Sequence, residues 1–298
     1  MSRAHRPRQT RSSRLRRVAA LRTAHQDLEI WRSDLATEFR VAGAVHAFYH
    51  RRRFLTGLVW DMLAAAALLG EKEEPRSVLM LGLAGGTSLR TLRHLLPACR
   101  FTAIDIDGEI VDLARRHMAL DATGVEVVIG DAYEWLRRNR RTFDVVVDDI
   151  YLAGRTDVFR PQAMDRHLLD SLRRCIAPGG VLAVNLVTGT GHRRTQSAIR
   201  RILCDAFAEV RSVTSPEAMN EVLVAGNTVA TARRLRKWDA AFAEAGDRNR
   251  WRKIAVRRIA ASKTLPPCTH QHERARRLIR SAQLRGAVGA PRIAREAG

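Results

Sequence analysis

The stretch that decides the fold is Val78-Leu-Met-Leu-Gly-Leu-Ala-Gly-Gly-Thr-Ser88. It predicts a buried β-strand that ends in a glycine cluster and opens into a helix. Glycines at such a turn let a ligand approach the backbone closely, beneath a helix N-terminus. Asp105 ends the next apolar strand, at the spacing where a carboxylate binds ribose hydroxyls in nucleotide-binding folds. The stretch therefore predicts a nucleoside-like ligand and leaves open which one.

Strands and helices alternate after this stretch, and short loops join them. The order predicts the α/β class, with a doubly wound, mostly parallel seven-stranded sheet and right-handed crossovers. No helix separates the last two strands, so they are expected to pair as a hairpin. That ending is typical of a methyltransferase-type Rossmann sheet and not of a dinucleotide dehydrogenase. The predicted strands are Ser77–Leu83, Phe101–Ile106, Val125–Ile129, Phe143–Asp149, Val181–Val187, Glu209–Thr214 and Glu221–Ala225.

Further segments flank this transferase-type domain, which we assign to residues 76–227. We expect residues 1–22 to be a disordered basic tail and residues 23–75 to be helical. Within Ala24–Arg40 apolar residues recur at helical spacing; they are Leu28, Trp31, Leu35 and Phe39. Residues 228–298 are expected to form a basic helical extension, with helices at Thr231–Ala245 and Trp251–Ala261.

The net charge of +21 is concentrated at the two ends of the chain. Residues 1–22 contain eight arginines and no acidic residue, and residues 248–298 carry a balance of +12. The residues between them are nearly neutral. Arginine-rich ends can bind phosphate backbones through counterion release, or they can be solvated tails. The N-terminal tail lacks the interleaved aromatic residues of single-strand binders, which favours solvated tails.

Cysteine usage and hydropathy bound the compartment. Cys99, Cys175, Cys204 and Cys268 are scattered and form no C-x-x-C pair, which favours free thiols in a reducing compartment. The run Cys268–Glu273 contains two histidines but lacks the usual zinc spacings, so no metal site is predicted. No apolar run approaches the roughly 20 residues of a membrane span. We therefore expect a cytoplasmic protein without membrane contact.

Ligands of open α/β sheets bind outside the carboxyl ends of the strands, so the residues that end strands are the candidate site. The first strand ends in Gly82-Leu-Ala-Gly-Gly86. The dinucleotide pattern G-x-G-x-x-G is not met, because Ala84 occupies its second glycine position. The second strand ends in Asp105, and Asp107 follows as a candidate helix cap.

The third and fourth strands also end in carboxylates. Asp131 can accept a hydrogen bond from an adenine amino group while the Ala132 N–H meets a ring nitrogen, and it also suits a helix N-cap. The fourth strand ends in Asp148-Asp149. Side chains alternate along a strand, so one of the two is expected to face the ligand, where it can orient an amine and accept its proton. Together the four strand ends predict S-adenosylmethionine rather than NAD.

Residues 78–187 resemble the spermidine synthase-like branch of class I S-adenosylmethionine-dependent transferases. The matching motifs, besides the glycine stretch, are Ile104-Asp-Ile-Asp107, Gly130-Asp-Ala132, Phe143-Asp-Val-Val-Val-Asp-Asp149 and Pro178-Gly-Gly-Val-Leu-Ala-Val-Asn185. The resemblance implies that Asp105 holds the ribose and that Asp131 with Ala132 holds the adenine. It implies that Asp149 is the catalytic aspartate, and Tyr151 beside it is a second candidate. The methionine portion would lie against the turn of Gly82, Ala84, Gly85 and Gly86.

Two departures from this branch bear on the reaction. Its polyamine-making members carry D-x-x-D-P from the catalytic aspartate, whereas Leu152 and Ala153 stand here at the second Asp and the Pro. Those members also have an N-terminal β-domain and a Tyr-His-Glu motif before the sheet. In Val59-Trp-Asp-Met-Leu63 only the acidic position survives, and the region before it is predicted to be helical. Both departures favour the methyltransferases of the branch.

The sequence thus predicts an S-adenosylmethionine-dependent transferase, with methyl transfer to an unknown small-molecule or protein acceptor as the leading hypothesis. The alternative is a polyamine aminopropyltransferase of the spermidine synthase type, which uses decarboxylated S-adenosylmethionine. A nucleic-acid-binding or RNA-modifying protein held by its basic tails is a third hypothesis, and a homodimer is left open. The segment Tyr151–Pro161, with Gly154 as a hinge, is a candidate substrate-gating loop.

Overall fold

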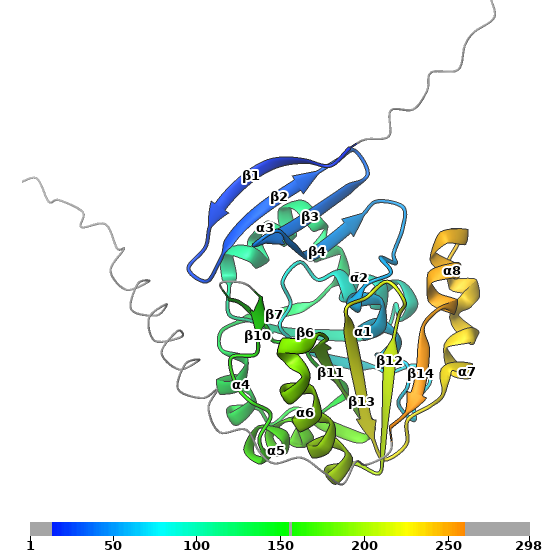
Figure 1. The fold of residues 1–298 in the computed structure, drawn as a ribbon. Helices are drawn as coiled ribbons and strands as arrows, with labels where there is room; N and C mark the ends of the chain where they lie inside the picture. Colours follow the sequence, from blue (N-terminus) through cyan, green and yellow to red (C-terminus); the bar gives the residue numbers. More distant parts are fainter. Residues whose placement is uncertain (1–13, 155–156, 260–298) are drawn as a thin grey trace, which may run out of the picture.

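The computed structural model describes residues 14–154 and 157–259. Its centre is an eight-stranded sheet (Figure 1), in which β5, β6, β7, β8 and β11 are parallel. The hairpin strand β13 is antiparallel to β11 and β12, and β14 is antiparallel to β12. This confirms the predicted mostly parallel sheet, with one strand more than seven. The strand order is β14 (Ala255–Arg258), β12 (Glu209–Thr214), β13 (Asn220–Gly226), β11 (Ile176–Val187), β8 (Phe143–Asp148), β5 (Ser77–Leu81), β6 (Arg100–Asp105) and β7 (Glu126–Ile129).

Helices cover both faces of the sheet, because its central strands are apolar on both sides. All six residues of β8 are buried. Val145 and Val147 belong to one core, which includes residues of α1 (Val59–Ala67), α2 (Thr87–Leu95) and α3 (Gly108–Met118). Val146 belongs to the other core, with α4 (Ala132–Arg138), α5 (Arg166–Arg174) and α6 (Arg193–Ala206). Each fully buried side chain of this kind contributes about 1.5–3 kcal/mol, and this burial fixes the two helix layers.

The prediction of a helical segment at residues 23–75 is wrong for its first part. This part contributes three strands to a four-stranded antiparallel sheet, whose order is β1 (Arg16–Arg22), β2 (Asp27–Arg32), β3 (Ala36–Val41) and β4 (Ala44–His50). The helical spacing of Leu28 and Phe39 spans the turn at Ser33, because the two residues belong to different strands. Within β2 the period is two: Leu28 and Ile30 are buried, whereas the alternate residue Trp31 packs against the Arg40 guanidinium at 4.3 Å.

The two extensions also differ from the prediction. Residues 16–22 were assigned to a disordered tail but form the edge strand β1. In the C-terminal extension, the predicted helix Trp251–Ala261 is replaced by α8 (Ala245–Arg252) followed by β14, which pairs with the open edge of β12. The predicted helix Thr231–Ala245 is reduced to α7 (Ala232–Leu235) and the 3-10 helix η3 (Arg236–Ala241). Residues 1–13 and 260–298, including Cys268–Glu273, lie outside the described residues.

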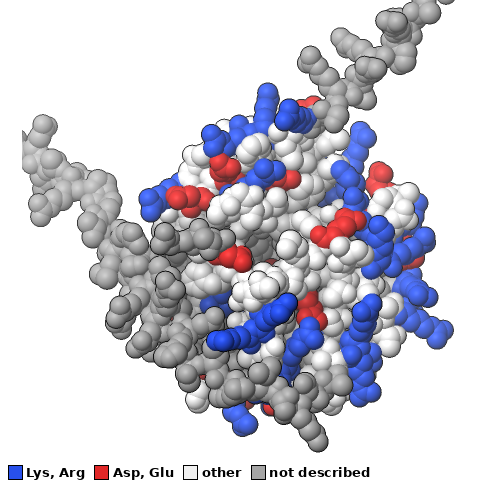
Figure 2. Space-filling view, in the orientation of Figure 1, with Lys and Arg blue, Asp and Glu red and all other residues white. Residues whose placement is uncertain are grey.

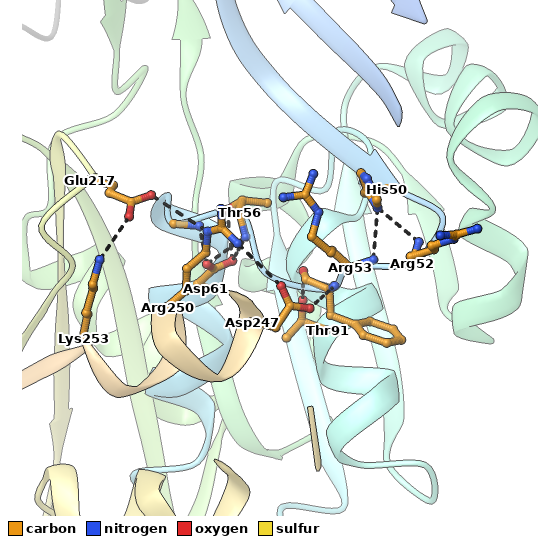
Figure 3. A network of polar contacts seen from close by, with 12 residues as sticks. His50, Arg52, Arg53, Thr56, Asp61, Thr91, Glu217, Asp247, Arg250 and Lys253 are labelled. Carbon is orange, nitrogen blue, oxygen red and sulfur yellow. Dashed lines mark hydrogen bonds and ion pairs between the residues drawn. The ribbon is translucent and has the colours of Figure 1, made fainter. Parts of the chain in front are cut away.

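A polar network joins the linker after β4 to the start of α1 and to α8 (Figure 3). The carboxylate of Asp61 in α1 accepts a hydrogen bond from the Gly57 N–H at 2.6 Å, and Asp247 in α8 accepts one from the Phe54 N–H at 2.7 Å. Arg250 lies 3.8 Å from Asp247. Burial raises the pKa of Asp61 to about 6, and the Asp247 charge acts in the same direction. The network ties the C-terminal extension to the N-terminal half of the molecule.

The described cysteines are not paired with one another. Cys99 and Cys175 are buried, and Cys204 is half-buried. Within residues 14–154 and 157–259, no helix combines the length and the apolar character that crossing a bilayer requires.

Candidate functional site

A cavity of about 450 Å³ lies at the carboxyl ends of the parallel strands, the size range of small-molecule sites. Strand ends supply Gly82, Asp105, Asp149 and Asn185 to its wall. The N-terminal sheet and α1 close the cavity with side chains that no sequence motif indicated. The sheet contributes His25 and Gln26 from the β1–β2 turn and Val45 and His46 from β4, and α1 contributes Trp60. Asp61, retained from the family motif, is not among the described lining residues.

The glycine turn after β5 contributes some residues to the cavity wall and others to the packing against neighbouring elements. Gly82 has φ +83° and lies so close to the end of β8 that a Cβ would be 2.5 Å from the Asp149 carbonyl oxygen. Ala84 also has a positive φ of +46° and lines the cavity. Gly85 and Gly86 are not among the described lining residues. A Cβ on Gly85 would be 2.4 Å from Ala47 of the N-terminal sheet, so this glycine permits close packing.

Asp105 lines the cavity and also holds the glycine turn in place. Its Oδ2 accepts hydrogen bonds from the N–H groups of Leu83 and Ala84, both at 2.8 Å, and its Oδ1 accepts one from Asp107 at 2.9 Å. Burial raises the pKa of Asp105, against the opposing effect of these hydrogen bonds. The carboxylate therefore shapes the turn, and Oδ1, which accepts a single hydrogen bond, keeps a second lone pair for a ligand.

Asp107 caps α3, as predicted, and has a second role that the sequence did not reveal. Its Oδ1 accepts the Ile110 N–H at 3.2 Å. Its Oδ2 accepts hydrogen bonds from Thr23 Oγ1 at 2.6 Å and Gln26 Nε2 at 3.3 Å. These contacts dock the β1–β2 turn on the helix beside the cavity. The N-terminal sheet is thereby fixed as part of the cavity wall.

Asp131 and Ala132 line the cavity at the start of α4. Asp131 Oδ1 accepts the N–H groups of Tyr133 at 2.7 Å and Glu134 at 3.2 Å, so it is an N-cap. Both interpretations of Asp131 from the sequence are therefore compatible with its place: it caps the helix and stands at the cavity wall.

Asp149 follows β8 and faces the cavity, next to a chain of amide side chains. Asn185 Nδ2 donates to Asp149 Oδ1 at 2.6 Å, and Asn220 Nδ2 donates to Asn185 Oδ1 at 3.0 Å. Burial raises the pKa of Asp149 to about 7, although the Asn185 hydrogen bond acts against the rise. A carboxyl group with this pKa changes its protonation state at neutral pH, which suits proton transfer.

Tyr151 lines the cavity, but its hydroxyl is bound to β11. The hydroxyl donates to the Asn185 carbonyl at 3.0 Å and accepts the Val187 N–H at 3.2 Å. Asp148, by contrast, is buried and pairs with Arg160 at 2.5 Å. The two adjacent aspartates therefore have different surroundings, as the alternation of side chains along a strand predicts.

The charge of the cavity wall is negative. Among its described lining residues, the Asp, Glu, Lys and Arg side chains are all aspartates: Asp105, Asp107, Asp131, Asp149 and Asp157. Figure 2 shows that Lys and Arg gather instead on the outer surface, over α7, α8 and β14. Carboxylates in a cavity attract cations far more strongly than exposed ones do, because the local dielectric constant is lower than that of water.

The doubly wound sheet with its final hairpin, and the cavity at its strand ends, define a methyltransferase-type Rossmann fold. The model of the spermine/spermidine synthase domain matches residues 58–224, more than half of the chain. The protein belongs to the spermine/spermidine synthase family. This confirms the resemblance of residues 78–187 to the spermidine synthase-like transferases.

Some curated relatives are named as polyamine aminopropyltransferases and others as methyltransferases. The chain is 28% identical over 175 residues to a probable polyamine aminopropyl transferase of Bifidobacterium longum, covering 57% of this chain and 38% of that protein. It is 27% identical over 180 residues to an eEF1A lysine and N-terminal methyltransferase of Danio rerio, covering 55% and 25% respectively. The chain thus spans less than half the length of these curated relatives. A solved structure of a probable spermidine synthase from Corynebacterium glutamicum shares the fold, with a TM-score of 0.63 at 14% identity over 84% of this chain and 99% of that one.

Proposed function

We propose that the protein transfers an aminopropyl group from decarboxylated S-adenosylmethionine to an amine acceptor. The observation that carries this proposal is the charge of the cavity, whose described Asp, Glu, Lys and Arg lining residues are all aspartates. Decarboxylated S-adenosylmethionine and a polyamine acceptor are both cationic and carry no carboxylate. A methyl donor would bring a carboxylate next to these aspartates, with no described Lys or Arg on the wall to pair with it.

The N-terminal sheet also supports aminopropyl transfer. The sequence favoured methyl transfer partly because the region before the main sheet was expected to be helical, unlike the β-domain of the polyamine-making members. That region is a β-sheet that closes the cavity, which removes the argument from a missing β-domain. The name of the Bifidobacterium longum relative points the same way. Two departures remain: Leu152 stands where those members have a second Asp, and Val59-Trp-Asp-Met-Leu63 keeps only the acidic position of their Tyr-His-Glu motif.

In the proposed reaction the acceptor nitrogen attacks the methylene carbon of the aminopropyl group that is bonded to the sulfonium sulfur. The carbon–sulfur bond breaks, methylthioadenosine leaves, and the proton lost by the nitrogen passes to Asp149. Asn185 holds the Asp149 carboxylate through the 2.6 Å hydrogen bond. Asp131 and Ala132 would hold the adenine, and the turn at Gly82–Ala84 with Asp105 would hold the ribose and the chain beyond it. The protein supplies orientation and one proton acceptor.

The by-product of the reaction tests the proposal. The protein is incubated with decarboxylated S-adenosylmethionine or with S-adenosylmethionine, each with a panel of diamines and triamines, and the products are identified by mass spectrometry. We expect methylthioadenosine and an acceptor lengthened by an aminopropyl group in the reactions with decarboxylated S-adenosylmethionine, and neither product in the reactions with S-adenosylmethionine. Asp149→Asn is expected to abolish both. S-adenosylhomocysteine formed from S-adenosylmethionine would instead establish the methyltransferase hypothesis.

Nucleic acid as a substrate finds no support at the cavity, because a phosphate group would meet aspartates there. The basic ends that suggested it lie mostly outside the described residues. Attachment to nucleic acid through those ends, and a homodimer, stay as predictions from the sequence.

A further inference from the structure

A buried ion pair lies directly beside the proposed catalytic carboxylate. Asp148, the last residue of β8, accepts a hydrogen bond from Arg160 Nη2 at 2.5 Å. The two side chains are 1% and 4% exposed. Arg160 follows β10 (Val158–Phe159), and its guanidinium lies 5.6 Å from the centroid of the Tyr151 ring. The pair therefore ties the segment that forms one wall of the cavity to the end of the central strand.

The stability of the fold does not explain this pair. Arg160 Nε and Nη1 are buried, and neither has a hydrogen-bond partner among the described residues. Buried donors without partners are costly. In addition, the free energy of desolvating two charges offsets most or all of the free energy of their attraction. Two apolar side chains of similar volume would serve the fold equally well or better. A buried pair of this kind next to a cavity is a candidate for a functional role.

The charges of the pair act on Asp149 in opposite directions. The Asp148 charge raises the pKa of Asp149, and the Arg160 charge lowers it. From β11, the Asn185 hydrogen bond also lowers it. The other described titratable side chains that line the cavity come from the β1–β2 turn, β4, the end of β6, the starts of α3 and α4, and the segment after β8; they are His25, His46, Asp105, Asp107, Asp131, Tyr133, Tyr151 and Asp157.

We propose that Arg160 is a positioning residue for Asp149: it balances the Asp148 charge and fixes the end of β8, so that Asp149 can receive the acceptor's proton. The proposal rests on the proposed function for the identity of Asp149 as the base. The effect of the pair on Asp149 is a property of the protein alone, and it can be measured without donor or acceptor.

Neutralising Arg160 and neutralising Asp148 are expected to shift the pH midpoint of Asp149 in opposite directions. Arg160→Met leaves the Asp148 charge unbalanced, so the Asp149 carboxyl holds its proton to higher pH. Asp148→Asn leaves the Arg160 charge unbalanced, so Asp149 releases its proton at lower pH. The double variant D148N/R160M removes both charges and brings the Asp149 midpoint back towards that of the wild type. Arg160→Lys keeps the positive charge and is expected to keep the midpoint.

The experiment follows the Asp149 carboxyl carbon by ¹³C NMR in the full chain labelled with [4-¹³C]aspartate, between pH 5 and pH 9. Asp149→Asn identifies the signal. The matched controls are Arg137→Met and Glu134→Gln, which break an exposed pair on α4 with 3.7 Å between its charged atoms. We expect R160M and D148N to change the proton affinity of Asp149 in opposite directions, each by about tenfold, which is one pH unit. The controls should leave it unchanged.

Midpoints that move in the same direction, or that do not move, would overturn the proposal. Thermal unfolding checks that each variant is folded. Where R160M does not fold, Arg160→Gln replaces it, because the amide removes the charge and still donates to Asp148.

Activity gives a second test that separates this proposal from the proposed function. The acidic limb of the kcat/KM profile is expected to follow the Asp149 midpoint measured by NMR in each variant. A limb that stays fixed while the NMR midpoint moves would overturn Asp149 as the base, and with it the positioning role of Arg160 in the reaction. By-product analysis that returned S-adenosylhomocysteine would refute aminopropyl transfer, and the same comparison would then test Arg160 for methyl transfer.

Discussion

Replacing Asp149 by Asn is expected to stabilise the folded protein above neutral pH while it removes the proposed base. Burial raises the pKa of this carboxyl from 3.8 to about 7. One pKa unit corresponds to 1.36 kcal/mol, so the ionised carboxylate destabilises the fold by on the order of 4 kcal/mol. Because the folded-state pKa is the higher one, the protonated carboxyl stabilises the fold fully at pH values below about 4. That stabilisation is lost as the pH rises through 7. An Asn side chain carries no charge and can still accept the Asn185 hydrogen bond.

Urea unfolding of both proteins at pH 5, 6, 7 and 8 measures this effect. The free energy of unfolding of Asp149→Asn, relative to that of the wild type, should rise by roughly 2 kcal/mol between pH 5 and pH 7. Above pH 7 this difference should stay constant. Asp112→Asn is the control, since this carboxylate is 61% exposed on α3, and its difference from the wild type should be the same at each pH. A difference between Asp149→Asn and the wild type that is constant from pH 5 to pH 8 would refute the reasoning.

Three further substitutions, one of them with a matched control, test the architecture of the cavity. At Gly82 the φ of +83° is unfavourable for alanine, and the Cβ of Gly82→Ala would lie 2.5 Å from the Asp149 carbonyl oxygen. The turn must therefore move, and calorimetry should show that the variant no longer binds methylthioadenosine. Gly43→Ala has a similar φ of +80° with open space around the Cβ, and it should cost only the backbone strain, about 1 kcal/mol, and keep binding. Thr23→Val removes a hydrogen bond that docks the β1–β2 turn and should weaken nucleoside binding by about 1 kcal/mol, near fivefold, with kcat unchanged. Asn185→Leu removes the donor to Asp149, so the acidic limb of the pH–rate profile should move to higher pH; an unmoved limb would argue against that contact.

The central sheet was predictable because its signals are local. In the run Phe143–Asp148 the central valines, Val145–Val147, are consecutive apolar residues, which predicts burial on both faces of the strand. The ends of the strands were predictable for the same reason, since a polar residue after an apolar run marks the carboxyl edge. Asp105, Asp131 and Asp149 all line one cavity although they are distant in the chain.

The N-terminal sheet was missed because two periodicities coincide in a short sequence. Leu28 and Phe39 fit a helical spacing when the turn at Ser33 is counted as part of one element. The alternation in Asp27–Arg32 fits a strand equally well, and only pairing with a neighbouring strand decides between them. The strand β14 was missed for a related reason: Ala255–Arg258 is extended because β12 offers an open edge, which no local pattern encodes.

Within the site, the sequence could indicate the need for partners without identifying them. Two adjacent carboxylates after a buried strand are costly unless each has a partner, and each does. Asp148 pairs with Arg160 and Asp149 with Asn185, and both partners come from later in the chain. Gly85 shows the opposite case. Its glycine was assigned to the ligand, but the close approach of Ala47, nearly forty residues earlier, accounts for it.

The overall charge of the chain and the charge of its cavity have opposite signs. The screening of exposed charges by salt explains why the two do not cancel. At physiological ionic strength the field of an exposed charge is screened within about 8 Å, so exposed arginines that lie further than this from the cavity have little influence inside it. The aspartates of the cavity act on a ligand at contact distance and in a lower dielectric constant. A net charge of +21 therefore predicts little about the ligand, whereas the residues that end the strands decide its sign. This is the reason why a basic chain can be proposed to act on cationic substrates.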